Sequence, residues 1–234
     1  MKSILKWMYS WAFSGNLSKT GWLYETDKCV GHHYVAVYQK FLKHLRFKKI
    51  NFLEIGIGGY EDPEKGGESL KMWRRFFPFA NLYALDFYEK RCFKGYNTKI
   101  YQGSQADPKV LDQIVKDAQR FDVILDDGSH INWHVIATFE HMYKHVVDGG
   151  YYIIEDTQTS YWPDYGGSGE NKKGEFTMME YFLKIANRIN YEEFVPRVKE
   201  PSYFDLNIKS MHFYHNLIII QKGSNTEGSN YLQW

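Results

Sequence analysis

Short apolar runs rich in β-forming residues alternate along this chain with amphipathic stretches of helical length. The runs predict strands at 50–58, 81–87, 98–104, 121–127 and 151–156. The amphipathic stretches predict helices at 69–77, 108–119 and 134–146, and we expect Gly149-Gly150 to stop the last one. Strands that alternate with helices of this length predict a Rossmann-like α/β fold, a mostly parallel sheet with helices on both faces.

The C-terminal part of the chain breaks this alternation. The segment MHFYHNLIIIQKG (211–223) predicts one or two strands with no helix between them, and therefore an antiparallel edge. Residues 1–46 predict a helical lead-in, 47–223 the α/β core, and 224–234 a flexible polar tail. Because no repeat or low-complexity linker interrupts the chain, we expect a single structural domain.

Charge and aromatic content narrow the function classes. The 29 Lys and Arg residues nearly balance the 28 Asp and Glu residues, for a net charge of +1. This balance argues against a generally basic nucleic-acid binder, and we expect no nucleic-acid partner. Aromatic residues make up 18% of the chain. Such an excess fills a core or lines a pocket for an apolar or sugar-like ligand, and composition leaves both alternatives open.

Cysteine usage and the N-terminal segment bear on location. Cys29 and Cys92 have neither a disulfide framework nor metal-ligand spacing, so a reducing compartment is expected. Residues 1–15 lack the unbroken apolar run and the cleavage site of a signal peptide. No stretch approaches the ~20 apolar residues that a membrane-spanning helix needs. We therefore expect a cytoplasmic protein without a membrane span.

The ends of the first two predicted strands suit a nucleoside cofactor. In open α/β sheets, ligands bind outside the carboxyl ends of the strands. The first strand leads through Glu54 to Gly56 and Gly58, which allow a tight turn and close approach of a ligand. Asp86 ends the second strand, where a carboxylate suits a ribose diol. Glu61 replaces the third glycine of GxGxxG, so the acidic loop suits a zwitterionic cofactor better than a pyrophosphate. The alternative is that these glycines merely end a strand.

Acidic residues also stand at the ends of the fourth and fifth predicted strands. If these strands are neighbours, about 4.8 Å apart, Asp127 meets Glu155 and Asp156 across a gap that a cation can bridge. An all-oxygen set without cysteine indicates a hard ion, Mg²⁺ or else Ca²⁺ or Mn²⁺. The alternative assigns helix capping to Asp127 and salt bridges to Glu155 and Asp156.

Histidines near these acids are candidate general bases. His130 lies three residues after Asp127, and a neutral imidazole there suits the removal of a proton from a metal-bound hydroxyl. His134 lies one helical turn further on and is the alternative base. A lone histidine is more often structural, so the position beside the acidic cluster carries this hypothesis.

The aromatic residues divide by position. We expect a group of phenylalanines in strands and on helix stripes to be core: Phe52, Phe76, Phe77, Phe121 and Phe139. We expect rings in loops at the ligand edge to contact a sugar: Tyr60, Tyr161, Trp162 and Tyr165. The loop 161–175, rich in glycine, lysine and aromatics, predicts a lid over the site or an ordinary exposed loop.

Five blocks of the sequence, in order, are similar to those of a known enzyme family. They are LEIGIGGYEDPEKGGESLKMW (53–73), GSQADP (103–108), DDGSHIN (126–132), IIEDTQTSYW (153–162) and MHFYHNLIIIQKG (211–223). Over roughly residues 24–223 the chain resembles the magnesium-dependent sugar O-methyltransferases of macrolide antibiotic biosynthesis, which use S-adenosylmethionine.

The resemblance implies a fold and a set of site residues. The fold is a class I methyltransferase sheet of seven strands, of which the last is antiparallel. The implied metal ligands are Asp127, Glu155 and Asp156, and the implied base is His130. The residues implied to face or lie near the cofactor are Glu54, Gly56, Gly58, Ser69, Asp86 (at the ribose), Gln105 and Asp126.

A mechanism follows from these parts. Mg²⁺ would chelate two adjacent sugar hydroxyls and lower the pKa of one of them. His130 would remove its proton while the oxygen attacks the sulfonium methyl in line. The acceptor sugar would belong to a capsule, lipopolysaccharide, glycolipid, nucleotide-sugar or antibiotic glycoside. Two alternatives stay open, a nucleotide-dependent Rossmann dehydrogenase and a non-catalytic module that binds S-adenosylmethionine or a sugar. Homo-oligomer formation also stays open.

Overall fold

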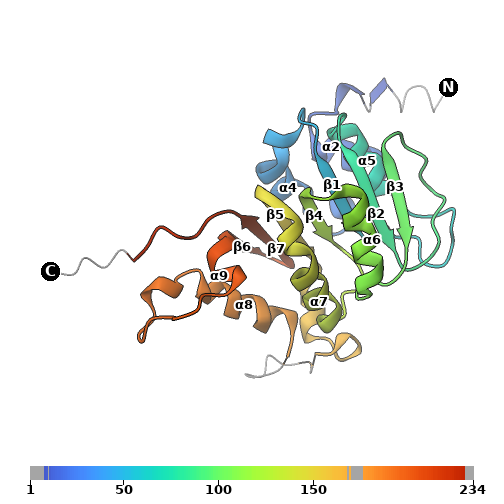
Figure 1. The fold of residues 1–234 in the computed structure, drawn as a ribbon. Helices are drawn as coiled ribbons and strands as arrows, with labels where there is room; N and C mark the ends of the chain where they lie inside the picture. The colour runs from blue at the N-terminus through green and yellow to red at the C-terminus, as the bar shows by residue number, and fades with distance from the viewer. Residues whose placement is uncertain (1–7, 10, 168, 170–175, 230–234) are drawn as a thin grey trace. The chain divides into compact units, whose positions relative to one another are not determined.

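The computed structural model describes residues 8–9, 11–167, 169 and 176–229. The chain forms two compact units, Met1–Ser104 and Gln105–Trp234. Each unit contains strands with helices packed on them, and Figure 1 follows them in chain order from blue to red.

The first unit contains three parallel strands in the order β3-β2-β1. They are β1 (Asn51–Ile55), β2 (Asn81–Asp86) and β3 (Thr98–Gln102). Helix α5 (Glu68–Phe76) connects β1 to β2. The described part of the lead-in is helical, with α2 (Leu17–Tyr24), α3 (Asp27–Val30), α4 (Val35–Leu42) and the 3-10 helix η1 (Lys43–Leu45). Helix α2 packs against α5 and α4.

Aromatic rings fill the core of the first unit. Trp73 of α5 is fully buried, and its ring lies 4.9 Å from the ring of Phe52 and 5.6 Å from that of Tyr38. Phe76 and Phe77 are also fully buried and meet edge to face. These rings account for part of the aromatic excess, since each removes a large apolar surface from water.

The second unit contains four strands in the order β4-β5-β7-β6. They are β4 (Phe121–Asp126), β5 (Val146–Glu155), β6 (Ile208–Tyr214) and β7 (Leu217–Lys222). Strands β4 and β5 are parallel, whereas β7 is antiparallel to both β5 and β6. The helices are α6 (Pro108–Ala118), α7 (Asn132–Met142), α8 (Met178–Arg188) and α9 (Tyr203–Asn207). The short 3-10 helices are η2 (Tyr143–His145), η3 (Thr157–Tyr161), η4 (Pro163–Tyr165) and η5 (Tyr191–Glu193).

The sequence led us to expect that Gly149 and Gly150 stop a helix, and this prediction is wrong. Helix α7 ends at Met142, and β5 begins before the glycines, at Val146. The glycines lie in an irregularity of β5, where the pairing with β4 shifts between Phe121 and Val123. Gly149 has φ 81°, and a Cβ on Gly150 would lie 2.7 Å from the carbonyl oxygen of Asp122. Glycine is therefore needed for the bulge and not for a helix end.

The antiparallel last strand is confirmed, but it is not the edge strand. Strand β7 lies between β5 and β6, so β6 forms the edge. A two-residue turn, His215-Asn216, joins β6 to β7, and Asn216 takes a positive φ of 60°, as tight hairpin turns require. The hydrophobic run 217–220 is buried, and it lies between two neighbouring strands of the sheet.

Phe139 of α7 organises the core of the second unit. It is fully buried, and its ring lies within 5.1 Å of the rings of Tyr152, Phe182 and Phe204. Phe121 of β4 is buried as well. All five phenylalanines that the sequence assigned to the core are therefore buried.

The segment after β7 is attached to the second unit through Asn225. Its backbone N–H donates to the carbonyl of Leu206 at 3.0 Å. Its side-chain amide donates to the carbonyls of Ile189 and Asp205 at 2.9 and 2.8 Å. Residues 230–234 of the predicted tail lie outside the described residues.

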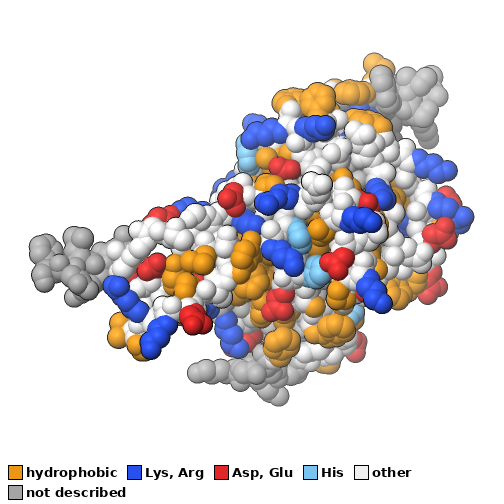
Figure 2. All heavy atoms as spheres, viewed as in Figure 1, with side chains coloured by type: hydrophobic (Ala, Val, Ile, Leu, Met, Phe, Trp, Pro, Cys, Tyr) orange, Lys and Arg blue, Asp and Glu red, His pale blue; other side chains and the backbone are white. Residues whose placement is uncertain are grey.

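Two surface properties bear on possible partners. Figure 2 shows basic and acidic side chains interspersed over the face that it draws. Among the described residues, none of the helices is long and apolar enough to cross a bilayer.

Candidate active site

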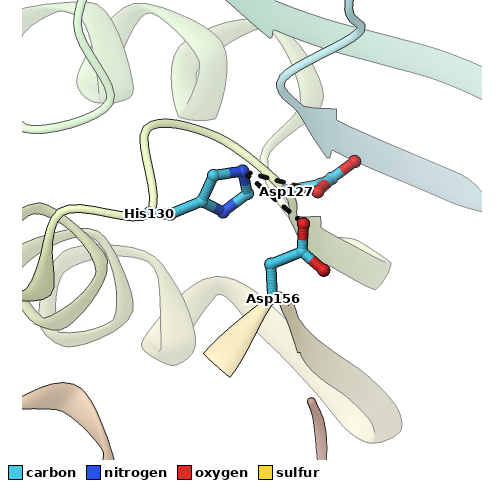
Figure 3. Close-up of side chains that lie close together, drawn as sticks. All are labelled: Asp127, His130 and Asp156. Atoms are coloured by element: carbon cyan, nitrogen blue, oxygen red, sulfur yellow. Dashed lines mark ion pairs between the residues drawn. The ribbon is translucent and has the colours of Figure 1, made fainter. Parts of the chain in front are cut away.

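Asp127 and Asp156 meet at the carboxyl ends of two neighbouring strands. Strands β4 and β5 are parallel, with Asp126 in register with Ile154, so the residues that follow them emerge side by side. His130 lies in the loop between β4 and α7. One ligand atom from each of Asp127, His130 and Asp156 lies within 4.8 Å of the others, and we call this group the acidic triad (Figure 3).

The triad leaves a gap between its polar atoms. His130 Nε2 lies 4.0 Å from Asp127 Oδ1 and 4.0 Å from Asp156 Oδ2. These distances exceed the ~3.2 Å of an N–H···O hydrogen bond. The side chains of His130, Asp127 and Asp156 are 22%, 15% and 16% exposed, so a small ligand can reach them. Two carboxylates and an imidazole at this spacing can hold a cation with the carboxylates and accept a proton with the ring.

Two members of the triad have left-handed backbones. His130 has φ 57° and Asp156 has φ 53°, a conformation that residues with a Cβ rarely adopt. The hydroxyl of Thr159 shares its one proton between the carbonyl oxygens of both residues, at 3.0 and 2.9 Å. The triad is therefore supported by a residue that the sequence analysis did not single out.

Glu155, the third predicted metal ligand, stands apart from the triad. It is the last residue of β5, pairs with Leu217 of β7, and is 2% exposed. In the described part of the chain, it does not belong to the group whose ligand atoms lie within 4.8 Å of one another. Its assignment as a ligand stays a prediction.

His134, the alternative base, lies in the first turn of α7. Its Nδ1 is 2.8 Å from the hydroxyl of Ser129, and its ring meets the edge of Trp133 at 4.0 Å. Burial lowers the pKa of His134. The triad does not include it, so His130 is the better placed of the two histidines.

Aromatic rings adjoin the triad within the second unit. The ring of Tyr165 lies 6.5 Å from that of His130 and 5.9 Å from that of Trp162. Trp162 is 48% exposed, so part of its side chain is open to solvent. Tyr161 ends η3 and is half-buried. Of the predicted lid 161–175, residues 168 and 170–175 lie outside the described residues.

A buried hydrogen-bond network lies under the loop that carries the triad. Gln105 accepts from the backbone N–H of Ser129 at 2.6 Å and donates to Asp126 Oδ1 at 2.9 Å. Tyr152 donates to Asp126 Oδ2 at 3.1 Å. Burial raises the pKa of Asp126 to about 7, although the hydrogen bonds from Tyr152 and Gln105 act to lower it. Gln105 and Asp126 thus fix the loop, and their place near the cofactor stays a prediction.

In the first unit, the loop 56–67 folds back on itself and needs glycine to do so. Its glycines all have positive φ: Gly56, Gly58, Gly59, Gly66 and Gly67. A Cβ on Gly59 would lie 2.2 Å from the carbonyl oxygen of Lys65, and one on Gly66 would lie 2.3 Å from that of Gly58. The ammonium group of Lys90 donates to the carbonyls of Tyr60 and Asp62. The tight fold exposes backbone, and Tyr60 itself is 86% exposed.

Asp86, the predicted ribose ligand, braces this loop. Its Oδ2 accepts the backbone N–H of Ile57 at 3.1 Å, and its Oδ1 accepts that of Tyr88 at 3.0 Å. A carboxylate has about four lone-pair positions, so Asp86 keeps the capacity to accept further hydrogen bonds. Its role at a ribose stays a prediction.

Glu54 is fully buried and contacts a lysine that the sequence did not predict. Its Oε1 lies 3.5 Å from Lys28 Nζ, and its Oε2 accepts the hydroxyl of Ser69 at 3.0 Å. Lys28 comes from the four-residue helix α3 and is only 1% exposed. The one available signal was Glu54 itself, because a carboxylate in an apolar strand requires a partner.

Comparison with curated proteins finds similarity to several O-methyltransferases. No protein-family model matches it. It is 38% identical to the Mycinamicin VI 2''-O-methyltransferase of Micromonospora griseorubida and 37% identical to the Demethylmacrocin O-methyltransferase of Streptomyces fradiae, each over 84% of this chain and 50% of the relative. It is 33% identical to the 8-demethyl-8-(2-methoxy-alpha-L-rhamnosyl)-tetracenomycin-C 3'-O-methyltransferase of Streptomyces olivaceus, over 92% of this chain and 56% of the relative.

Solved structures of a methyltransferase are also similar to this chain. The MycE methyltransferase from the mycinamycin biosynthetic pathway, in complex with Mg and SAH, matches with a TM-score of 0.87 and 38% identity, covering 91% of this chain and 56% of that one. A complex that also contains mycinamycin VI matches with a TM-score of 0.86 and 37% identity, over 91% and 55% of the two chains. The chain is a relative of O-methyltransferases. It spans about half the length of the curated relatives it matches.

The comparisons confirm two expectations. The resemblance on which the sequence analysis relied is found over most of the chain. The expected fold class, seven strands that are mostly parallel with an antiparallel last strand, is confirmed as well.

Proposed function

We propose that this chain transfers the methyl group of S-adenosylmethionine to a hydroxyl of a sugar, with Mg²⁺ held at Asp127 and Asp156. The acidic triad is the observation that carries the proposal, because it places two carboxylates and a histidine at adjoining strand ends. Two further findings support the proposal. The relatives are named as O-methyltransferases, one of them of a rhamnosyl compound, and the MycE complexes contain Mg and SAH.

The donors of the triad fit a hard divalent cation. Asp127 and Asp156 contribute carboxylate oxygens, which Mg²⁺ prefers, and both side chains remain partly exposed, as open coordination positions for a substrate require. We assign Glu155 as a third ligand on the strength of its place in the sequence, next to Asp156. When bound, the cation would stabilise negative charge on the acceptor oxygen.

His130 would act as the general base. Its Nε2 faces the carboxylates of Asp127 and Asp156, and its ring is partly exposed, so an acceptor hydroxyl at the triad comes within its reach (Figure 3). The exposed ring of Trp162 and the ring of Tyr165 would stack on the sugar, since sugar C–H faces pack on aromatic rings. Tyr60, Tyr161 and His134 are further assigned as substrate contacts.

The glycine loop of the first unit would bind the cofactor. Gly56 and Gly58 let backbone approach the ligand closely, and Asp86 would accept the ribose hydroxyls. The remaining residues that we assign near the cofactor are Glu54, Ser69, Gln105 and Asp126.

The setting of the reaction is also part of the proposal. Cys29 and Cys92 are both free thiols, which suits a reducing compartment, so we place the reaction in the cytoplasm. We assign residues 1–46 as a lead-in to a methyltransferase core, 47–223. Assembly into a homo-oligomer and the absence of a nucleic-acid partner stay predictions.

Mass spectrometry of methyl transfer tests the proposal. The protein would be incubated with deuterium-labelled S-adenosylmethionine and a panel of nucleotide-sugars, rhamnosides, macrolide glycosides and oligosaccharides, with Mg²⁺ or with excess chelator. We expect one labelled methyl group on at least one sugar, and no product with the chelator. Product that forms equally well with the chelator would contradict the metal-dependent mechanism.

The same assay separates the alternatives. A non-catalytic module would bind S-adenosylmethionine in equilibrium dialysis and methylate no sugar. A nucleotide-dependent dehydrogenase would change the nicotinamide absorbance and leave the labelled cofactor intact. That function would leave the acidic triad without a role, and we do not favour it.

A further inference from the structure

Thr159 joins the two loops that carry the acidic triad. It lies in η3, directly after β5, and is 2% exposed. Its hydroxyl oxygen is 3.0 Å from the carbonyl oxygen of His130 and 2.9 Å from that of Asp156, so its single proton is shared between these two acceptors. One hydroxyl therefore connects the loop after β4 to the loop after β5.

The two carbonyls belong to the residues of the triad with left-handed backbones. A non-glycine residue in this region costs on the order of 1–3 kcal/mol and persists only where its surroundings hold it. For Asp156, the backbone N–H of Thr159 is a second donor to the same carbonyl, at 3.1 Å. For His130, the hydroxyl of Thr159 is the tie to the neighbouring loop. The hydroxyl of Thr159 thus contributes to the placement of His130 relative to Asp156.

We propose that Thr159 is a positioning residue of the metal site, and that its hydroxyl sets the separation between His130 and Asp156. The inference rests on the proposed function and goes beyond it, because Thr159 would touch neither the cation nor the substrate. Without the hydroxyl, the loop of His130 loses a hydrogen bond to the segment that follows Asp156, and the gap of 4.0 Å between their polar atoms is held less firmly. Metal affinity and the proton transfer at Nε2 would both suffer.

Three variants isolate the hydroxyl. Thr159→Val keeps the shape of the side chain and removes the hydroxyl, whereas Thr159→Ser keeps the hydroxyl and removes the methyl group. Ser160→Ala is the matched control: Ser160 is 1% exposed, lies in the same 3-10 helix, and has a hydroxyl without a hydrogen-bond partner among the described residues.

The first measurement is the affinity of each variant for Mn²⁺. Electron paramagnetic resonance measures the binding of Mn²⁺ in the absence of cofactor and substrate. We expect Thr159→Val to weaken Mn²⁺ binding by about 10- to 100-fold, as the loss of an outer-shell partner typically does. Thr159→Ser should restore most of the affinity, and Ser160→Ala should bind as the wild type does. At saturating Mn²⁺, kcat of Thr159→Val should stay low while KM for the cofactor is unchanged.

The outcomes separate this inference from the proposed function. Wild-type Mn²⁺ affinity in Thr159→Val overturns the inference, as does an equal loss in Thr159→Val and Thr159→Ser. Wild-type protein that binds no Mn²⁺ overturns the proposed function instead. Thermal melts of all variants identify a general loss of stability, and Thr159→Ala replaces Thr159→Val in the comparison if the latter does not fold.

Discussion

The glycine loop of the first unit (56–67) and the loops of the second unit that carry the acidic triad both contain residues with positive φ, but the residue types differ. In both, these residues lie at the carboxyl ends of parallel strands. In the loop 56–67 this conformation is mostly taken by glycines, with Tyr60 as the exception. In the triad loops it is taken by His130 and Asp156, to whose side chains we assign the chemistry of the site.

The difference indicates what each loop presents to a ligand. A glycine at positive φ costs little and leaves no side chain, so the loop 56–67 offers its backbone at close range. A histidine or aspartate in that conformation costs free energy, and it persists where the surrounding structure holds it. In the second unit, hydrogen bonds from other residues help to hold the loop of His130 in place. Thr159 donates to the carbonyl of His130, and Gln105 accepts the backbone N–H of Ser129.

The largest effect should come from removing a charge of the triad. Asp127→Asn keeps the size of the side chain but weakens its hold on a cation, and we expect methyl transfer to fall about 10⁴-fold because the charge stabilisation that the metal supplies is lost. S-adenosylmethionine binding, measured by calorimetry, should change little, because the glycine loop is left intact. Near-normal turnover in Asp127→Asn, or in wild-type protein with excess chelator, would mean that the triad loops are not a metal site.

The next effect distinguishes the two histidines. His130→Asn should lower kcat by about 10²-fold or more, as the loss of a general base does. Asparagine is chosen because it tolerates positive φ better than alanine. His134→Asn is the matched control: its amide can keep the contact with Ser129 Oγ, which the ring makes at 2.8 Å. Steady-state kinetics at saturating Mg²⁺ measures kcat of both variants. A larger fall in kcat in His134→Asn than in His130→Asn would assign the base to His134.

A pair of glycine substitutions tests the other side of the comparison. Gly58 and Gly66 both have positive φ, but a Cβ on Gly58 meets nothing within 4 Å, whereas one on Gly66 would lie 2.3 Å from a backbone oxygen. Gly58→Ala should therefore lower the free energy of unfolding by about 1 kcal/mol, the cost of a left-handed alanine. Gly66→Ala adds a backbone clash and should lose about 3 kcal/mol or more. Urea unfolding measures both, and equal losses would show that the loop yields to the added methyl group.

The sequence predicted the strand ends well because apolar runs and acidic residues mark them directly. Asp86, Asp126 and Glu155 each end a strand, as expected. The boundary at Gly149-Gly150 was wrong because glycine ends a helix or permits a bulge equally well, and only the pairing of β5 with β4 decides which.

The supports of the site were not predictable. Lys28 lies in a four-residue helix with no periodicity, and its burial follows from the packing of the lead-in on the first unit. Thr159 is one of several hydroxyl residues between 157 and 160, and its contact with His130 joins positions 29 residues apart. Sequence reasoning finds groups that carry charge, whereas the residues that hold them in place are determined by tertiary contacts.

The smallest expected effect is a pH dependence of stability that belongs to one side of the comparison only. Burial lowers the pKa of His134 below its ordinary value of 6.5, so the unfolded chain binds a proton more readily than the folded one. The stability that neutral His134 contributes is thus present above pH ~6.5 and is lost as the pH falls through the folded pKa. His134→Asn cannot bind this proton, so its Tm relative to the wild type should rise between pH 7.5 and pH 5.5. Since His134 is only partly buried, the change should be small, and a Tm difference independent of pH would show that the ring beside Ser129 takes up its proton as freely in the folded protein as in the unfolded chain.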